Sequence, residues 1–300
     1  METRRLRTDR LDIAYLAHGP ADGPAALLLH GFPDDATAWT AVMERLGARG
    51  HRCIAPYARG CGGERGTRFL RDDTPRAGDF PALGNDALAL VDALDLRDLV
   101  VVGQDWGSPV AEIVAMMRPD RVRQLVKLNW YGVYSMLELS RAQGFGWAQL
   151  RALWYVWMLN LPLGEMVLQY DSVGFARALW AEWSPSWAAA ERDAALDSAL
   201  PSLVGDDWRR VALAAYRAGT SPAETDPADD ALRVRLQDPP PVSCATHILT
   251  GADDGVERTP LTPEQLARWF PAGAHSEALR GVGHWPHRER PDAVIAAVLA

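Results

Sequence analysis

The sequence predicts an α/β fold, in which a mostly parallel central sheet is flanked by helices and interrupted by an inserted helical cap. Short apolar runs that end in glycine or proline alternate with helix-like stretches, which is typical of parallel sheets. From about residue 134 to residue 227 the chain has no strand-like run and is rich in helix formers and tryptophan. We therefore expect a core formed by residues 1–133 and 228–300, and a cap formed by residues 134–227.

Five apolar runs are expected to form buried strands, because strands that are covered on both faces are apolar throughout. They are AALLLHG (25–31), CIAP (53–56), LVVVG (99–103), LVKLN (125–129) and HILTG (247–251). Lys127 is the only lysine and falls in the fourth run. We expect it at a solvated edge of the sheet.

The stretches between these strands carry helix signals. We expect helices over 36–48, over 86–94 and over 108–117, the first of them capped by Asp34 or Asp35. A segment with three consecutive prolines (227–243) then returns the chain from the cap to the sheet, because proline cannot continue a helix.

The composition excludes several classes of protein. The 300 residues include 31 basic and 39 acidic side chains, and the formal net charge of −8 repels phosphate backbones and anionic lipids. No window holds the ~20 apolar residues that a membrane helix needs. The amino-terminal residues lack the apolar run of a secretory signal. We therefore expect a cytoplasmic protein that binds neither nucleic acid nor membrane.

The strongest motif is Val100–Ser108, where an apolar strand runs into Gly-x-Asp-x-Gly and then into a helix. Gly103 and Gly107 flank Asp105, because the backbone of a tight turn passes too close to itself for side chains. Such a turn pushes its central residue out at the carboxyl ends of the strands, where open α/β sheets bind ligands. Asp105 is therefore the candidate nucleophile. The alternative is that its carboxylate only interacts with the helix N-terminus.

Three further motifs accompany this turn. They are His30-Gly31-Phe32-Pro33 before it, and Gly251-Ala252-Asp253-Asp254 and Gly283-His284 after it. Through these four motifs the chain resembles α/β-hydrolases of the epoxide hydrolase and haloalkane dehalogenase branch, and the likeness covers essentially the whole chain. The resemblance implies the α/β-hydrolase fold with a helical cap.

An aspartate at this turn, where such hydrolases often have serine, indicates the chemistry. A carboxylate suits in-line displacement at a saturated carbon and leaves an alkyl ester on the enzyme, whereas a serine alkoxide suits attack on a carbonyl. Asp105 therefore points away from esterase or peptidase activity and towards an epoxide oxygen or a halide as leaving group. This alkyl transfer needs no metal, and we expect no cofactor.

His284 and Asp254 are the candidates for the base and for the group that orients it. The order nucleophile, acid, histidine is that of α/β-hydrolases. His284 would take a proton from the water that attacks the ester, and Asp254 would hold the histidine tautomer. By resemblance the acid falls three residues after Gly251, which selects Asp254, with Asp253 as the alternative.

The backbone N–H groups of Phe32 and Trp106 are the candidate oxyanion hole. In this fold the loop after the strand at 25–31 supplies one donor, and the residue after the nucleophile supplies the other. Both N–H groups should point at the ester oxygen as charge builds up during hydrolysis. Pro33 has no N–H and only fixes the loop.

Epoxide hydrolases have two cap tyrosines whose hydroxyls donate to the epoxide oxygen, and the resemblance implies equivalents here. Tyr216, in ALAAYRAG, matches the second well. Tyr155, in LWYVWMLNLP, is the candidate for the first, although counting back from Pro162 places the family's tyrosine nearer Met158. Three residues are almost one helical turn, so Tyr155 can share that face. The reserves are Tyr131, Tyr134 and Tyr170.

A haloalkane or haloacid dehalogenase is the alternative enzyme. Dehalogenases hold the leaving halide with indole or amide N–H groups, and Trp106 and Trp157 are the candidates here. Gln104 before the nucleophile occurs in some dehalogenases. Phe32, however, stands where many dehalogenases have asparagine, and it brings no side-chain donor. We therefore favour the epoxide.

The aromatic cap supplies candidate walls for a substrate pocket, because its tryptophans offer more apolar surface than a thin helical layer usually hides. We expect Trp157, Met158 and Trp285 to line the pocket and the substrate to be a small apolar molecule. A receptor that binds such a ligand without converting it is a further alternative. The complete set of nucleophile, base and acid argues against it. A homodimer stays open.

Further histidines do not indicate a metal site. His287 and Glu289 follow His284 closely, but no other ligands converge in the sequence. We expect no metal and place His287 at the surface. The remaining histidines without a partner motif are expected to be structural; they are His18, His51, His247 and His275.

Overall fold

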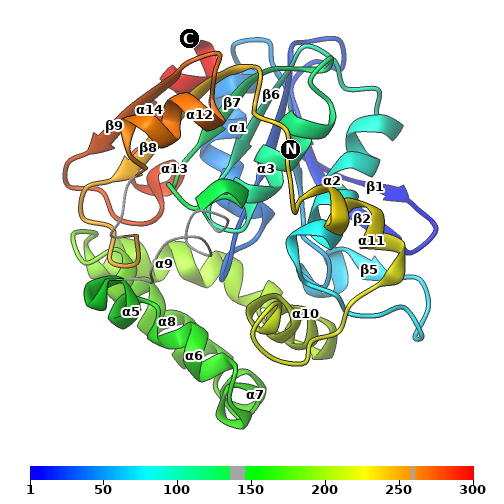
Figure 1. The fold of residues 1–300 in the computed structure, drawn as a ribbon, viewed down its shortest axis with the longest axis vertical. Helices are drawn as coiled ribbons and strands as arrows, with labels where there is room; N and C mark the ends of the chain where they lie inside the picture. Colours follow the sequence, from blue (N-terminus) through cyan, green and yellow to red (C-terminus); the bar gives the residue numbers. More distant parts are fainter. Residues whose placement is uncertain (136–145, 258–260) are drawn as a thin grey trace.

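Nine strands form one mixed sheet in the part of the chain that the computed structural model describes, residues 1–135, 146–257 and 261–300 (Figure 1). The strands are β1 (Glu2–Arg7), β2 (Leu11–His18), β3 (Ala25–Leu29), β4 (Arg52–Pro56), β5 (Arg68–Phe69), β6 (Leu99–Gly103), β7 (Val122–Lys127), β8 (Ala245–Gly251) and β9 (Ala274–Leu279). Their order is β1-β2-β4-β3-β6-β7-β8-β9, with β5 beside β2. From β4 to β9 all neighbours are parallel, whereas β2 is antiparallel to β1, β4 and β5. The prediction of a mostly parallel sheet is confirmed.

The five predicted strands are β3, β4, β6, β7 and β8, and the sequence analysis missed the other four. The two edge strands, β1 (ETRRLR) and β9 (AHSEAL), are mostly exposed and polar. Neither has the continuous apolar run by which a buried strand is recognised, because an edge strand has less surface to bury.

Helices cover both faces of the sheet. Those of the core are α1 (Thr40–Gly47), α2 (Phe80–Ala93), α3 (Gly107–Met117), α11 (Asp230–Arg235), α12 (Pro263–Trp269), α13 (Pro286–Glu289) and α14 (Pro291–Leu299), with short 3-10 helices at 36–39, 63–65 and 227–229. Along β6, Val100 and Val102 pack with α1 and α14, whereas Leu99 and Val101 pack with α2 and α3. This alternation follows from the two-residue period of a strand.

The described residues between β7 and the linker before β8 form helices and no strand, as predicted for this part of the chain. They are α5 (Trp147–Ala152), α6 (Trp154–Leu159), α7 (Pro162–Tyr170), α8 (Ser172–Trp183), α9 (Ala189–Ala199), a 3-10 turn at 200–202 and α10 (Asp206–Arg217). Figure 1 shows them as a separate layer beside the sheet. They cover the loop after β3, because the Trp180 indole N–H donates to the carbonyl of Pro33 (3.1 Å) and Trp208 stacks on Phe32. Among the described residues, no helix combines the length and the hydropathy that crossing a bilayer demands.

Lys127 does not lie at a solvated edge, and that prediction is wrong. β7 is an interior strand between β6 and β8. The side chain of Lys127 is buried in an ion pair with Glu112 of α3, and Glu112 also accepts the N–H of Val133 (2.6 Å). A buried charge needs such a partner, and the sequence does not reveal that α3 supplies it.

His287 is likewise not at the surface. It is fully buried in α13, where its ring packs against Trp39 at a centroid distance of 4.3 Å. Burial, together with the charge of Arg288, lowers the pKa of His287 well below its ordinary value. The histidine is therefore a neutral core residue. In the sequence His287 stands next to charged residues, which favoured a surface position, but the sequence does not show which side of the short helix faces inward.

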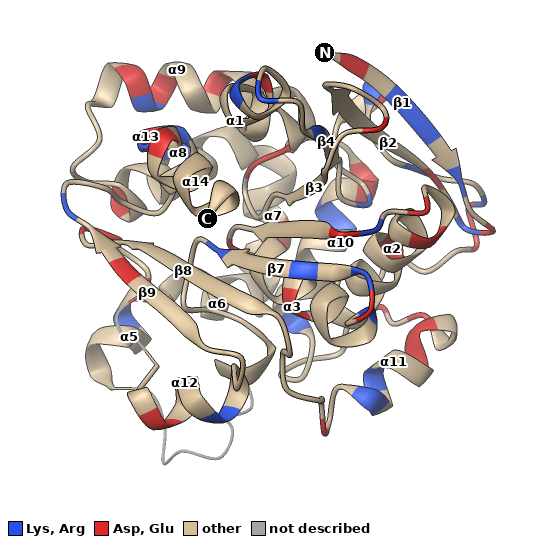
Figure 2. Cartoon of the chain, turned by 90° about the horizontal axis from the view of Figure 1, so that it is seen from above, with Lys and Arg blue, Asp and Glu red and all other residues tan. Residues whose placement is uncertain are grey.

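Acidic and basic side chains are mixed along the surface elements. Figure 2 shows both signs on β1, α9 and α11, so the excess of acidic residues is not concentrated on these elements. Mixed charges of this kind avoid a strong local field of one sign on these elements.

Candidate functional site

The turn between β6 and α3 has the strained geometry that its sequence predicts. Asp105 has φ of +50°, in the left-handed region that side chains other than glycine rarely adopt. A Cβ on Gly103 would lie 2.1 Å from the carbonyl oxygen of Gly107, and a Cβ on Gly107 would lie 2.1 Å from that of Leu29. Both flanking residues must therefore be glycine, and the turn presents Asp105 at the carboxyl end of β6.

The loop after β3 approaches the Asp105 carboxylate directly. The backbone N–H of Phe32 donates to Asp105 Oδ1 at 2.8 Å. A Cβ on Gly31 would lie 2.3 Å from the Cβ of Asp105, so this approach also needs glycine. The ring of Trp106 stacks on that of Phe32 at 5.0 Å. The backbone N–H of Phe32, one of the two predicted oxyanion donors, thus contacts the carboxylate, and the ring of the other, Trp106, packs on that of Phe32.

The folded chain brings His284 and Asp254 to Asp105. His284 lies in the loop after β9, with its Nε2 3.5 Å from Asp105 Oδ2 and its Nδ1 2.8 Å from Asp254 Oδ2. The other oxygen of Asp254 accepts the N–H groups of Val256 (2.8 Å) and Glu257 (3.1 Å). The alternative acid, the neighbouring Asp253, is exposed. The three predicted side chains therefore form one continuous array of contacts.

Two carboxylates stabilise the charged form of His284. Burial lowers its pKa, but the charges of Asp254 and Asp105 and the hydrogen bonds to them outweigh this effect and raise the pKa from 6.5 to about 10. At neutral pH the imidazole is therefore protonated. When Asp105 loses its charge, one of these contributions disappears, and the pKa of His284 falls.

Replacing Asp105 by asparagine is therefore expected to lower the pKa of His284, as measured by NMR titration of its ring protons. Because the pKa of His284 is raised in the folded protein, the resulting stability is full below pH 6.5 and is lost as the pH rises through about 10. In Asp105→Asn, the stability that protonated His284 contributes should therefore be lost at a lower pH than in the wild type. Asp253→Asn, which removes an exposed charge, is the matched control. An identical titration in Asp105→Asn would contradict the electrostatic account.

Asn129, to which the sequence analysis assigned no role, contacts two members of this array, Asp105 and His284. It follows the end of β7, and its Oδ1 accepts the backbone N–H of Asp105 at 2.6 Å. Its Nδ2 lies 3.4 Å from Nδ1 of His284. Gln104 is also buried and donates to the backbone carbonyl of His284 at 3.1 Å, so its side chain positions the histidine loop. A polar residue at the carboxyl end of a predicted strand was the available signal for Asn129.

Glu257 is a second residue that the sequence analysis missed. Its carboxylate accepts the backbone N–H groups of Trp130 and Tyr131, both at 2.6 Å, and its own N–H donates to Asp254. Glu257 thus connects the loop after β7 to the turn that holds the acid. Burial and the charge of Asp254 raise the pKa of Glu257 to about 7, against the opposing effect of His284.

The two predicted tyrosines meet beside the nucleophile turn. Tyr155 of α6 and Tyr216 of α10 make an edge-to-face contact with ring centroids 5.5 Å apart. Tyr216 also contacts Phe32 at 5.2 Å and Trp106 at 5.4 Å. Burial first, and then nearby groups that include Asp105, raise the pKa of both phenols well above 10. Both hydroxyls therefore stay protonated at neutral pH and can act as donors.

The three reserve tyrosines lie in different parts of the structure. Tyr131 is close enough to the nucleophile for the charge of Asp105 to raise the pKa of its hydroxyl, after the larger effect of burial. Tyr134 is buried in the core, where its hydroxyl donates to the carbonyl of Pro240. Tyr170 is 76% exposed at the end of α7. Only Tyr131 of these three lies with the site.

Trp157 does not lie with the other predicted site residues. It is 43% exposed, and it follows Tyr155 by two residues, or about 200° around α6. When Tyr155 faces inward, Trp157 must therefore face away. The neighbouring Met158 is partly buried against the core.

A different indole lies beside the histidine. The ring of Trp183, at the end of α8, is 4.8 Å from that of His284 and 5.0 Å from that of Tyr155. Trp285 is fully buried and packs between His284 (5.0 Å), Trp180 (4.2 Å) and Trp183 (5.8 Å). It therefore supports the histidine within a stack of aromatic rings.

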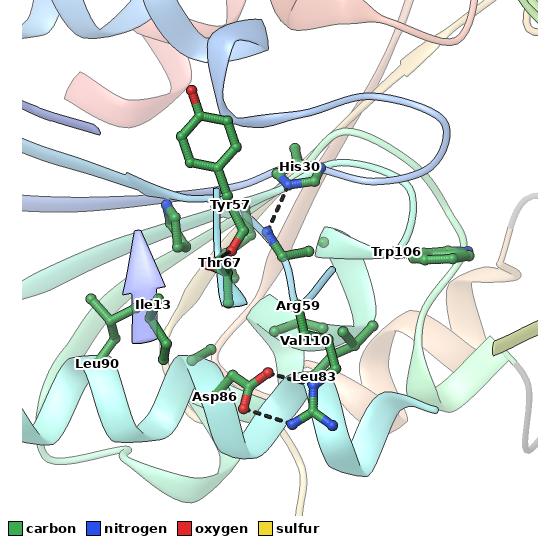
Figure 3. A pocket seen from close by; sticks show the side chains of 15 residues that line it. Ile13, His30, Tyr57, Arg59, Thr67, Leu83, Asp86, Leu90, Trp106 and Val110 are labelled. Carbon is green, nitrogen blue, oxygen red and sulfur yellow. Dashed lines mark hydrogen bonds and ion pairs between the residues drawn. The ribbon is translucent and has the colours of Figure 1, made fainter. Parts of the chain in front are cut away.

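A cavity lies behind Trp106, and Asp105 does not line it (Figure 3). Its walls are mostly apolar, with His30 on one side and the ion pair of Arg59 with Asp86 (2.7 Å) on the other. Arg59 also donates to two backbone carbonyls, so its charge is already compensated. The predicted reactive groups gather where the turn after β6 meets α6 and α10.

The acidic and histidine side chains near His284 do not converge on an ion. Glu289 accepts the N–H of Gly283 (2.9 Å) and the hydroxyl of Ser184 (2.8 Å), and His287 faces Trp39. Within residues 1–135, 146–257 and 261–300, no three or more histidine, cysteine, aspartate or glutamate side chains are grouped as metal ligands.

Comparisons with known proteins agree with this architecture. The family model described as "Alpha/beta hydrolase family" matches residues 26–297. An epoxide hydrolase of Caballeronia sordidicola is 28% identical over 89% of this chain and 84% of its own length, and a haloalkane dehalogenase of Mesorhizobium japonicum is 28% identical over 95% and 86%. A crystal structure from Klebsiella pneumoniae, provisionally described as an epoxide hydrolase, is 30% identical and superimposes with a TM-score of 0.88 over 99% of this chain and 96% of that one.

Proposed function

This chain belongs to the alpha/beta hydrolase family, and on that premise we propose that it opens epoxides to vicinal diols through an alkyl ester on Asp105. The observation that carries the proposal is the meeting of two protonated phenols, Tyr155 and Tyr216, beside a nucleophile turn that also holds His284. An epoxide needs both an attacking carboxylate and a proton donor for the leaving oxygen.

In the first step a carboxylate oxygen of Asp105 attacks one ring carbon. The new carbon–oxygen ester bond forms while the bond from that carbon to the ring oxygen breaks. The ring oxygen takes a proton from Tyr155 or Tyr216, whose hydroxyls remain protonated until then. Before the attack the protonated His284 lies beside the Asp105 carboxylate, with Nε2 3.5 Å from Oδ2.

In the second step water hydrolyses the ester. Esterification removes the charge of Asp105, so the pKa of His284 falls and its proton can replace the one that the phenol gave away. Neutral His284, oriented by Asp254, then takes a proton from water, and the hydroxide attacks the ester carbonyl. The backbone N–H groups of Phe32 and Trp106 stabilise the resulting oxyanion. When this intermediate collapses, the bond from the carbonyl carbon to the diol oxygen breaks, and the departing alkoxide takes the proton from His284. The carboxylic acid of Asp105 returns a proton to the imidazole, so the diol leaves and the Asp105 carboxylate retains one oxygen from water.

A single turnover in oxygen-18 water tests this proposal. Because water attacks the ester carbonyl, the label should enter the carboxylate of Asp105, where peptide mass spectrometry detects it. Label found only in the diol would mean direct attack of water on the epoxide. A receptor that binds the ligand without converting it would form no diol and carry no label in Asp105.

Removing one phenol hydroxyl should slow ring opening specifically. Tyr216→Phe and Tyr155→Phe are each expected to reduce the rate of ester formation by ~10²-fold or more, because each removes a proton donor. Rapid-mixing measurement of ester formation reports this step. Tyr170→Phe changes an exposed tyrosine of the same helical layer and is the matched control. If neither site variant slowed ring opening, the donors would lie elsewhere.

A haloalkane dehalogenase is the second candidate, and one observation favours it. The indole N–H of Trp183 is buried next to His284 and has no hydrogen-bond partner within the described residues. Trp183 could thus take the halide-binding role with Trp106 that the sequence analysis assigned to Trp157. Halide release from haloalkanes distinguishes the two functions. A dehalogenase would keep its rate in Tyr216→Phe, because a halide leaves without a proton.

The surroundings of the site also suggest the class of substrate. The rings of Phe32, Trp106, Tyr155 and Tyr216 pack against one another around the turn that carries Asp105, so we expect a small, predominantly apolar epoxide. Residues 134–227 would act as the cap that excludes water during ester formation, with the core formed by 1–133 and 228–300.

A further inference from the structure

Helices α6 and α7 present apolar side chains on two opposite sides. Their inner sides hold Tyr155 and Leu159 of α6, and Gly164 and Leu168 of α7, all buried. Their outer sides carry large apolar residues that are between 37% and 76% exposed. These residues, which we call the outer apolar face, are Trp154, Trp157, Leu161, Leu163, Met166 and Tyr170.

The spacing of these residues places them on continuous stripes. Leu163, Met166 and Tyr170 stand at i, i+3 and i+7 of α7, and Trp154 and Trp157 stand at i and i+3 of α6. The two helices pack against each other, and the turn that joins them carries Leu161. Figure 1 places both helices at the margin of the molecule. Single exposed apolar residues are normal, but a contiguous group of this kind marks an interaction site.

We propose that the outer apolar face binds the same face of a second copy of this chain. At about 200 Å² for each of these large side chains, aromatic or aliphatic, the exposed fractions correspond to about 640 Å² per copy, close to the ~800 Å² that each partner buries in a standard interface. A two-fold axis brings identical patches together, and an apolar patch is complementary to itself without charged partners.

The nearby charges favour a second copy over a lipid surface. α6 contains no charged residue. The exposed charges near the face are Arg151, Glu165, Asp171 and Glu182, and Glu182 accepts the indole N–H of Trp154 at 2.8 Å. Helices that lie on membranes carry several lysines or arginines on their polar side. Anionic lipids would also repel a chain with a net charge of −8.

Sedimentation velocity of the full chain at micromolar concentrations tests the proposal. We expect a species of twice the 32.9 kDa chain mass that dissociates on dilution. Met166→Lys and Leu163→Lys should each raise the dimer dissociation constant by about 100-fold or more, because each copy would bury an unpaired charge. Val234→Lys is the matched control, since Val234 is an exposed apolar residue of α11, outside the face.

The outcomes separate the possible occupants of the face. A dimer that both lysine variants weaken, and the control does not, supports the proposal. A wild-type chain that stays monomeric at every concentration overturns it, and so does a dimer that both variants leave intact. A monomer that sediments with phosphatidylcholine vesicles would identify the face as a lipid-binding surface. Circular dichroism shows that the variants remain folded. These outcomes do not depend on which leaving group the site accepts.

Discussion

Asp105→Ala is expected to reduce the conversion of epoxides by about 10⁴-fold or more, while the protein stays folded. The substitution removes the oxygen that forms the ester, so only direct attack by water remains. Diol formation under steady-state conditions measures the loss. Thermal unfolding measures any change in stability, since the Phe32 N–H loses its acceptor in this variant.

The control for this prediction is Asp253→Ala. Asp253 lies next to Asp254 in the sequence but is exposed, and it is Asp254 that contacts His284. The Asp253→Ala variant should convert epoxides at close to the wild-type rate. If Asp105→Ala kept a substantial fraction of that rate, Asp105 would not be the nucleophile, and the two-step scheme would have to be abandoned.

His284→Gln should separate the two steps by trapping the ester. Asp105 can still attack the substrate, but no neutral imidazole is present to take a proton from water, so ester hydrolysis should slow by ~10²–10⁴-fold. Intact-protein mass spectrometry should then show an adduct with the mass of the substrate. Peptide mapping should locate the adduct on Asp105.

Asp254→Asn provides the comparison for the trapped ester. It keeps the imidazole but removes the carboxylate that orients it, so ester hydrolysis should be slowed less than in His284→Gln. If no epoxide or haloalkane converted by the wild type gave an adduct in His284→Gln, the covalent intermediate would be in doubt for both candidate functions.

Motifs with local steric requirements were predicted correctly. Gly103, Asp105 and Gly107 form the expected turn, because a Cβ at either glycine would overlap the backbone within a few residues or on the adjacent strand. The pairing of His284 with Asp254 was also predicted, because both residues follow the nucleophile turn in the order nucleophile, acid, histidine. Asn129 and Glu257 were missed because their partners lie on other strands or loops, and neither belongs to a recognisable motif.

The predictions that failed concern which side chains are buried and which partners they meet. Trp157 was chosen as a halide donor from its residue type, but α6 can bury only one side, and that side carries Tyr155. Trp183, more than twenty residues later in the chain, reaches His284 instead. Lys127 and His287 were placed at the surface because their chemistry favours water, whereas Glu112 and Trp39 provide buried partners.

The sequence by itself determined the alternation of strands and helices, the sharp turn at Asp105 and the order of the reactive residues. These properties depend on backbone sterics and on hydrophobic periodicity, which act over a few neighbouring residues. Only the tertiary structure decided which cap side chains face the nucleophile, and that α6 and α7 keep a second apolar side exposed. Both depend on how each helix is rotated against the core, and this rotation is set by packing between segments that are distant in the chain.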